Sequence, residues 1–551
     1  MKRFTFSVMM ALATMVASAQ DFGTKAWTDN LSTMEVPGNL LRSTPVIVDN
    51  EGNAIVTGSY DMDFTFNNAV ARATDADHFI AKYGVNGQKL WAAALQGNST
   101  ITAITTDSEG NVYVAGNFAL TVNVVDAKGK TEEITGLADK TSGACFIAKY
   151  NKDGELQLVK TVLPEADQSV ITDDILWAQQ EPSFNVNKIE VANGKLYLSA
   201  TYKEICKIGN LTLTGKFINS DGWMLADAPS ASVVSLDAAT LDNAKELVTL
   251  SAKEKITSEN IYGPEDINFT VDGTTLYVGL VARGKEMTLK TVKGEENISL
   301  AYEAGAQEHA FVLAKVEGDK ATTKVYNTTA SEASFSWNYM DEMACKNGKL
   351  YVAGTFNEAN PFDNNVTFKK NCDIYVAALN ANDLTKEWVA ASGFDEGETN
   401  KTAEVVTGMV VKGDNVIVTG WAEETDHHTV NTPLTYTVDA NGHMTQGAET
   451  LVTAMATNGT NVLTESDKDG VYIYTYYTNT PETGIKQLVK AEGVSRQGDV
   501  LSFTKATDIT VYATSGACVK AVKNATSVSL EGLAKGVYVV KAGDKSIKVA
   551  K

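Results

Sequence analysis

The chain has 551 residues, a formal net charge of -21 and a pI near 4.8. This length exceeds that of one ordinary domain unless the chain is a repeat array. The negative charge argues against a nucleic-acid or anionic-membrane surface, because such surfaces need clustered Lys and Arg.

The first residues have the features of an export signal. Lys2 and Arg3 supply positive charge, Val8–Val16 is a short apolar run, and small residues end the segment at Ala19. The apolar run is too short to anchor the chain in a bilayer, and no later stretch is long enough to do so. We therefore predict a signal peptide over residues 1–19, cleaved near Ala19, and an exported chain without a transmembrane span.

A hairpin motif recurs after the signal segment. Its best copy, Thr105–Phe118, reads TTDSEGNVYVAGNF, an acidic turn ending in Gly-Asn that leads into an alternating strand. Gly, Asn and Asp at such turns supply positive φ angles or side-chain-to-backbone hydrogen bonds. Six good copies and a weaker seventh are found at Val46–Tyr60, Ile104–Phe118, Ile189–Tyr202, Phe269–Val281, Met343–Phe356, Met409–Ala422 and Leu451–Ser466.

A second motif of strand, polar turn and strand follows each good copy, as in HFIAKYGVNGQKLWAAAL at His78–Leu95. The repeating unit is therefore four strands, recurring every roughly 50–85 residues, which is the pattern of a β-propeller. We predict an all-β fold whose propeller most simply has seven blades, with six or eight left open.

The seventh unit has no clear fourth strand of its own. Lys25–Leu31 resembles Lys89–Leu95, the fourth strand of the first unit, so we predict that Trp27 completes the last blade. The alternative closure uses Gly484–Val489.

The repeat resembles the bacterial SBBP-type β-propeller repeat. The matching residues form the run Asp77, Phe79, Ile80, Ala81, Lys82, Tyr83 and Trp91, followed by Asp107, Gly110, Asn111, Tyr113, Val114 and Gly116. The match is good in the first two units and decays after them. The resemblance implies a propeller in an extracellular setting and no particular activity.

The composition changes near residue 480, and five short alternating strands follow from residue 495. The end of the chain resembles the type IX secretion (Por) C-terminal sorting domain, through Gly536, Tyr538, Val540, Gly543, Lys545, Lys548 and Val549. Lys535 stands where that family often has Pro. We predict a propeller over 20–480, a linker over 481–494 and a small β-sandwich over 495–551. The resemblance implies that secretion machinery binds this domain and that the rest is then attached to the surface or released.

Connection lengths distinguish the two rims of the predicted propeller. The turns between strands one and two, and between three and four, are short, whereas the other connections are long and variable. Binding residues usually lie on such irregular segments, so the rim with the long connections is the candidate binding face.

The tryptophans in or beside these connections are the ligand-binding candidates, because exposed aromatic rings suit sugars and protein partners. They are Trp177, Trp223, Trp337 and Trp421. The alternative is that the loops bury their own aromatic side chains.

The other reactive residues give weaker signals. His78, His309, His427 and His428 fall on the loop face, where solvated loop residues are the simpler interpretation. The five cysteines form no CxxC pair and suggest no disulfide framework. No sequence motif for a catalytic nucleophile, metal or phosphate is present, so we predict no cofactor, no metal and no catalytic residue.

These features favour a non-enzymatic surface or secreted protein that binds a glycan or a protein through its loop face. Two alternatives remain open. One is a propeller hydrolase or lyase acting on extracellular polysaccharide or peptide, since propeller enzymes can assemble a site from distant blades. The other is a structural surface-layer or adhesin component.

Overall fold

The computed structural model is nearly all β, and its strands divide between two compact units, 1–479 and 480–551. The residues that it describes are 22–32, 44–66, 69–71, 77–137, 143–170, 177–179, 181–219, 224–252, 263–283, 286–299, 309–327, 338–357, 359–367, 369, 372–392, 401–424, 430–447, 451–468, 471–478, 494–497, 499–513, 518–533, 537–542 and 545–550. In this part of the chain the single helix is a 3-10 turn at Gln168–Val170, and no helix is long and apolar enough to cross a membrane.

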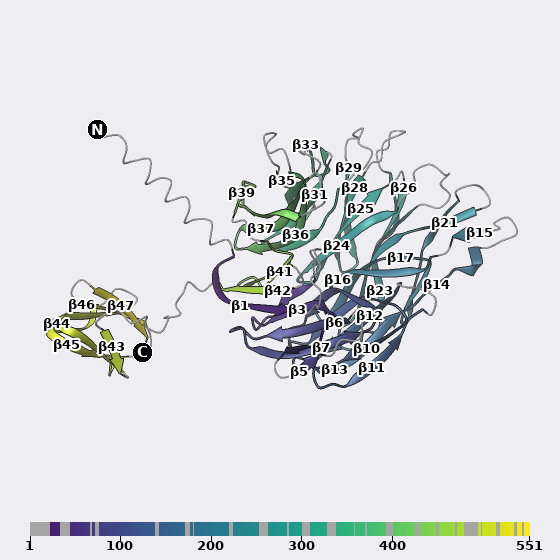
Figure 1. Ribbon diagram of the computed structural model, residues 1–551. Helices are drawn as coiled ribbons and strands as arrows, with labels where there is room; N and C mark the ends of the chain where they lie inside the picture. The colour runs from purple at the N-terminus through teal and green to yellow at the C-terminus, as the bar shows by residue number, and fades with distance from the viewer. Residues whose placement is uncertain are drawn as a thin grey trace. The chain divides into compact units, whose positions relative to one another are not determined.

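Four-stranded antiparallel meanders repeat along the larger unit (Figure 1). We number them in chain order. The first three are β2 (Val46–Val48), β3 (Ala54–Tyr60), β6 (Asp77–Tyr83) and β7 (Lys89–Gln96); β8 (Ser99–Thr106), β9 (Val112–Phe118), β12 (Ala144–Tyr150) and β13 (Leu156–Val162); and β16 (Ser183–Ala192), β17 (Lys195–Lys203), β22 (Ser230–Asp237) and β23 (Lys245–Ala252). The next three are β24 (Pro264–Asp272), β25 (Thr275–Arg283), β28 (His309–Glu317) and β29 (Lys320–Asn327); β30 (Glu342–Lys346), β31 (Lys349–Phe356), β34 (Asp373–Asn380) and β35 (Lys386–Ala391); and β36 (Lys401–Lys412), β37 (Asn415–Glu424), β38 (Val430–Val438) and β39 (Met444–Gln446).

The last meander takes its fourth strand from the other end of the chain. β40 (Ala454–Thr457), β41 (Val462–Lys468) and β42 (Val471–Thr478) pair in order, and β1 (Thr24–Ser32) adds antiparallel to β42. Figure 1 shows purple β1 beside green β42. Trp27 lies in this added strand, opposite Tyr476. Gly484–Val489 lies outside the described residues.

Each meander packs face to face on the next, and the order of these contacts is circular. One buried cluster joins the first and second meanders through Ile80, Val114 and Phe146. Another joins the seventh to the first through Phe79 and Tyr474. The innermost strands also contact one another in turn, and β40 contacts β2. The sheets therefore close into a ring, and the fold of the larger unit is a β-propeller.

The acidic turns of the repeat are stabilised by their own side chains. Asp49 Oδ1 accepts hydrogen bonds from the Glu51 and Asn53 amides at 3.0 and 2.8 Å, and Asp107 accepts the equivalent pair in the second meander. Gly52 completes the first turn with φ +84. The Asp carboxylate thus accepts hydrogen bonds from turn amides that have no partner in a neighbouring strand. This explains why the turns share the Asp-x-x-Gly-Asn pattern.

Fourth-strand tryptophans join neighbouring meanders at three places. The indole Nε1 of Trp27, Trp91 and Trp388 donates to the backbone oxygen of Val85, Lys152 and Ala440, at 3.2, 2.9 and 3.1 Å. Each acceptor belongs to the turn between strands three and four of the next meander. Trp91 is buried and the other two are partly buried, so these rings are part of the packing between meanders.

The connections between strands two and three contain short strands that the sequence analysis did not predict. Two of these hairpins cross to the preceding meander: β10–β11 (Thr121–Val125 and Thr131–Thr135) pairs with β7, and β26–β27 (Glu286–Thr291 and Gly294–Ser299) pairs with β23. A third hairpin, β18–β19 (Ile205–Ile208 and Leu211–Thr214), pairs with β14 (Pro164–Glu165), in the connection between the second and third meanders. The other short strands are β4 (Phe64–Phe66), β5 (Ala69–Ala71), β15 (Trp177–Gln179), β20 (Lys216–Asn219), β21 (Met224–Ala228), β32 (Ala359–Asn360) and β33 (Asp363–Thr367).

The described residues of the smaller unit form five strands with a core of their own. They are β43 (Val494–Gln497), β44 (Val500–Ala513), β45 (Cys518–Ser529), β46 (Val537–Ala542) and β47 (Lys545–Ala550). Leu501, Ile509, Val511 and Val540 are fully buried in this core. The first two strands expected from the sequence, Val500–Phe503 and Ile509–Tyr512, are both part of the continuous strand β44.

Candidate functional site

A cavity of about 570 Å³ lies at the axis of the propeller, where the innermost strands meet. Its lining comes from all seven meanders, through β2, β8, β16, β24, β30, β36, β40 or the residues just before them. Each innermost strand runs from the rim with the long connections to a short turn, and most of the lining residues are in the first half of their strand or just before it. The cavity therefore lies nearer the rim with the long connections, and we call it the channel mouth.

Charged and amide side chains occupy one side of the channel mouth: Lys188, Asp266, Asn268, Asp341 and Glu342. They come from β16, β24 and the start of β30, which are neighbouring innermost strands. The register of three separate sheets thus brings together residues that are far apart in the sequence.

The Asn268 side chain links Asp341 to Lys188 by hydrogen bonds. Its Nδ2 donates to the backbone oxygen of Asp341 at 2.6 Å, and its Oδ1 accepts from Lys188 Nζ at 3.2 Å. The Lys188 ammonium also lies 5.7 Å from the centre of the Phe269 ring. The ammonium therefore has a defined position at the channel mouth.

Two carboxyl groups here, those of Asp341 and Glu342, have raised pKa values. Burial raises the pKa of Asp341 well above its usual range, and the neighbouring Asp266 and Glu342 carboxylates raise it further. Burial also raises the pKa of Glu342 to about 6, against the opposing effect of Lys188. One oxygen of Asp341, Oδ2, has no hydrogen-bond partner among the described residues. Burial and the like charges of its neighbours therefore favour the protonated, hydrogen-bond-donating form of Asp341.

The tryptophans predicted to bind ligand do not gather at this cavity in the part of the chain that the structure describes. Trp421 lies in β37, partly buried, opposite Val405 and Pro433, and does not line the channel mouth. Trp177 lies in β15, which pairs in parallel with β21. Trp223 and Trp337 lie outside the described residues.

The histidines are also separated. His78 is in β6 and His309 begins β28, whereas His427 and His428 lie outside the described residues. His443 is exposed in a short turn, where its amide donates to Asp439 Oδ1 at 3.0 Å. Within the ranges that the structure describes, no group of three or more His, Cys, Asp or Glu side chains could hold a metal ion, and the five cysteines are unbridged.

The residues of the predicted sorting motif lie in the last two strands of the smaller unit. Tyr538 and Val540 of β46 are buried, and Tyr538 pairs with Val549. Lys545 and Lys548 belong to β47, and Gly536 and Gly543 are outside the described residues.

The channel-mouth residues were not predicted from the sequence. Lys188, Asp266, Asp341 and Glu342 are charged residues in or next to innermost strands, but β16 and β24 contain other polar residues too, so these four do not stand out. These residues meet only because their strands are neighbours at the propeller axis. A local sequence pattern does not show which strands become neighbours.

Comparison with known proteins supports a propeller repeat and goes no further. No family model matches the chain. An uncharacterized WD repeat-containing protein of Acanthamoeba polyphaga mimivirus, L264, is 28% identical over 123 residues, which cover 20% of this chain and 9% of that protein. The chain therefore matches less than a tenth of the length of this relative.

Solved propeller structures resemble the chain only distantly. The Dos1 propeller aligns with a TM-score of 0.39 at 10% identity, covering 82% of this chain and 95% of that chain. BamB from Moraxella catarrhalis aligns with a TM-score of 0.30 at 10% identity, covering 80% and 98%. Polysaccharide lyase Uly1 aligns with a TM-score of 0.36 at 9% identity, covering 84% and 98%. Because these scores are low, the assignment of the fold rests on the strand pairing and ring contacts described above.

Proposed function

We propose that this protein is an exported cell-surface or secreted binding protein that takes a glycan at the channel mouth. One observation carries the proposal: a cavity of about 570 Å³ at the axis, with ammonium, carboxyl and amide groups side by side. This volume is within the range of small-ligand sites. Sugars both donate and accept hydrogen bonds, so a mixed set of donors and acceptors suits them.

Glycan-array binding by the full chain tests this proposal. We expect signal for a subset of glycans, reduced at least tenfold by Lys188→Met, because the ammonium is a fixed donor at the channel mouth. Lys160→Met is the matched control, since Lys160 is exposed and pairs with Asp242 elsewhere on the propeller. Absence of array binding, or equal binding by the two variants, contradicts the proposal. A variant with Ala at Trp177, Trp223, Trp337 and Trp421 tests the loop contribution separately.

A hydrolase or lyase is the second candidate, favoured by the raised pKa of Asp341 beside the Asp266 and Glu342 carboxyl groups. A protonated carboxyl beside a carboxylate can donate and accept protons during bond cleavage. Release of new reducing ends or unsaturated sugars from polysaccharides, abolished in Asp341→Asn, would favour this enzyme over the binding protein.

For delivery we propose a type IX-like route, supported by the N-terminal signal pattern and the C-terminal sorting motif. We expect truncation before residue 495 to leave the propeller inside the cell envelope, and the full chain to reach the surface or the medium. Equal surface exposure of the two proteins, measured by protease accessibility on intact cells, would contradict this route.

A further inference from the structure

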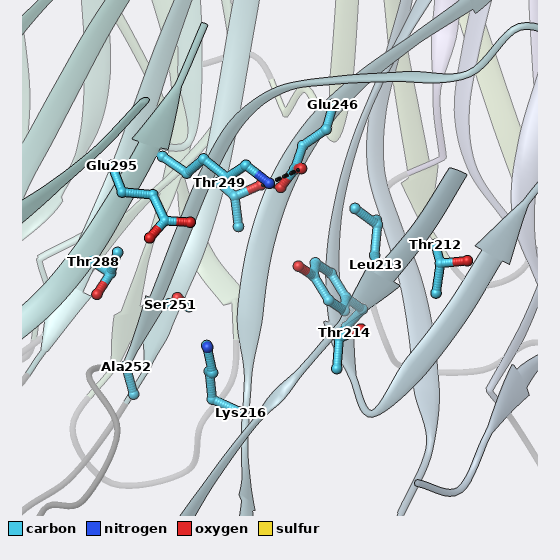
Figure 2. Close-up of a pocket in the computed structure, with 12 residues that line it drawn as sticks. Thr212, Leu213, Thr214, Lys216, Glu246, Thr249, Ser251, Ala252, Thr288 and Glu295 are labelled. Carbon is cyan, nitrogen blue, oxygen red and sulfur yellow. Dashed lines mark hydrogen bonds and ion pairs between the residues drawn. The ribbon is translucent and has the colours of Figure 1, made fainter. Parts of the chain in front are cut away.

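A second cavity, of about 530 Å³, lies away from the axis, on the outer strands of the third meander (Figure 2). One wall comes from β23, β26 and β27, and the other from β19 and the start of β20. We call it the hydroxyl groove, because half of the side chains that line it carry a hydroxyl group.

Strand register creates the first wall. Ser251 of β23 is paired with Thr288 of β26, and two residues along, Thr249 is paired with Lys290. β27 continues the second row, because Lys290 is paired with Glu295. Since side chains alternate between the two faces of a strand, these polar groups all project from the same face of the sheet.

A crossing hairpin extends this wall beyond β23. β26 and β27 belong to the connection between the second and third strands of the fourth meander, yet they pair beside β23 of the third. The groove is therefore built by two consecutive repeat units.

The opposite wall is also polar. Thr212 and Thr214 of β19 are exposed, and they share a face because they are two residues apart. Figure 2 shows the Lys216 ammonium and the Glu295 carboxylate entering the same space from different sides, with Ser251 between them. Tyr202 also lines the groove, but it is only 2% exposed and offers no ring face for stacking.

The charges in the groove balance. Lys290 Nζ lies 2.6 Å from Glu246 Oε2, and the Thr249 hydroxyl donates to the other oxygen of Glu246. Two lysines, Lys216 and Lys290, thus accompany two glutamates, Glu246 and Glu295, so the described side chains that line the groove have no net charge. A strongly anionic ligand gains little in such a site, on a chain whose net charge is already -21.

We propose that the hydroxyl groove is a second binding site, for a neutral oligosaccharide. Rows of hydroxyl groups with a carboxylate and an ammonium at the rim match the vicinal hydroxyls of an uncharged sugar chain, and the apolar area needed for a hydrophobic ligand is missing. Recognition depends on hydrogen bonds without ring stacking, so each contact contributes modestly and the affinity is low. This inference stands apart from the proposed site at the channel mouth.

Titration calorimetry and saturation-transfer NMR on the full chain test the groove, with cello-, malto-, manno- and xylo-hexaose as neutral probes and oligogalacturonate as the anionic comparison. We expect at least one neutral probe to bind. The double variant Ser251→Ala/Thr288→Val should weaken its binding at least fivefold, and Glu295→Gln should weaken it less.

Two controls make the result decisive. Thr131→Val alters an exposed threonine of the corresponding hairpin β10–β11 and should leave binding unchanged. Lys188→Met alters the channel mouth, so groove binding that persists in this variant separates the two sites. Failure of every neutral probe, stronger binding of oligogalacturonate, or unchanged binding by the double variant with an unchanged melting temperature would each overturn the proposal.

Discussion

Three glycines show how closely the repeat fits its neighbour. A Cβ atom added to Gly87, Gly154 or Gly442 would lie 2.9, 2.6 or 2.9 Å from the ring of Trp27, Trp91 or Trp388. These glycines occupy the turn whose carbonyl accepts the indole hydrogen bond. Each has a φ between +78 and +84, a conformation that other residues adopt only at a cost. Gly and Trp are therefore two parts of one contact between meanders.

Replacing Gly154 by Ala should destabilise the propeller more than the same change at Gly129. Gly129 has the same backbone conformation, φ +83, but no atom near its missing Cβ. The left-handed backbone alone costs about 1–2 kcal/mol, and overpacking against Trp91 adds about 1–3 kcal/mol in Gly154→Ala. Urea unfolding of both variants measures the difference, and equal losses would show that the tryptophan ring moves aside freely.

Glu342 should make stability depend on pH. Its pKa in the folded protein is about 6, above the ordinary value of 4.5, so between these values the folded state binds more protons than the unfolded state. Stability therefore falls as pH rises through this window, by an amount on the order of 1–2 kcal/mol. Glu342→Gln should be more stabilising at pH 7 than at pH 4.5 in chemical denaturation, whereas Glu296→Gln, at an exposed position on β27, should show no such change.

The sequence predicted the meanders well, because each depends on local information. Alternating apolar residues and the Asp-x-x-Gly-Asn turn specify β8 and β9 within a few residues of one another. The crossing hairpins were not predicted, because β10 is only five residues long and its partner β7 belongs to the preceding meander. The channel mouth was missed for the same reason: Lys188 and Asp341 meet only through the neighbouring positions of β16, β24 and β30.

β1 is the element on which closure of the ring depends. Trp27 stacks between Tyr83 and Tyr476, with ring centres 5.2 and 5.3 Å apart, and Leu31 is buried in the same cluster. A chain that begins after Ser32 would leave the β42 edge and this apolar cluster exposed. We expect a markedly lower melting temperature, restored in part by an added peptide spanning Thr24–Ser32.

The same peptide with Leu31→Asp is the control and should not restore stability, because a carboxylate would enter the apolar cluster. If the shortened chain melts like the full one, β1 does not contribute to closure. Rescue by the control peptide would mean that the added peptide acts without docking beside β42.

At the scale of the whole molecule, the chain consists of two units with separate cores. Among the described residues, the clusters of the propeller contain none from the smaller unit, whose core is built from β44, β45, β46 and β47 and the turn after β45. Independent cores permit independent unfolding, because each unit loses its own buried surface.

Calorimetry of the full chain should therefore resolve two transitions. Val540→Asp places a charge at a fully buried position of the smaller unit and should abolish only its transition. Trp27→Ala should lower only the transition of the propeller. A single transition that both substitutions shift equally would show that the units unfold together.

The pairing of β1 with β42 also has a consequence for the order of assembly. Thr28 and Thr475 are hydrogen-bonded although they are 447 positions apart in the sequence. β1 is therefore synthesised early but can pair with β42 only after almost the entire propeller has been synthesised. Such long-range closure is entropically demanding and slow. Until β42 is available, every incomplete chain presents an unpaired first strand and an open last sheet. A prematurely terminated product that lacks β42 therefore cannot complete the ring. The final step of folding can occur only in a chain that contains both ends of the propeller.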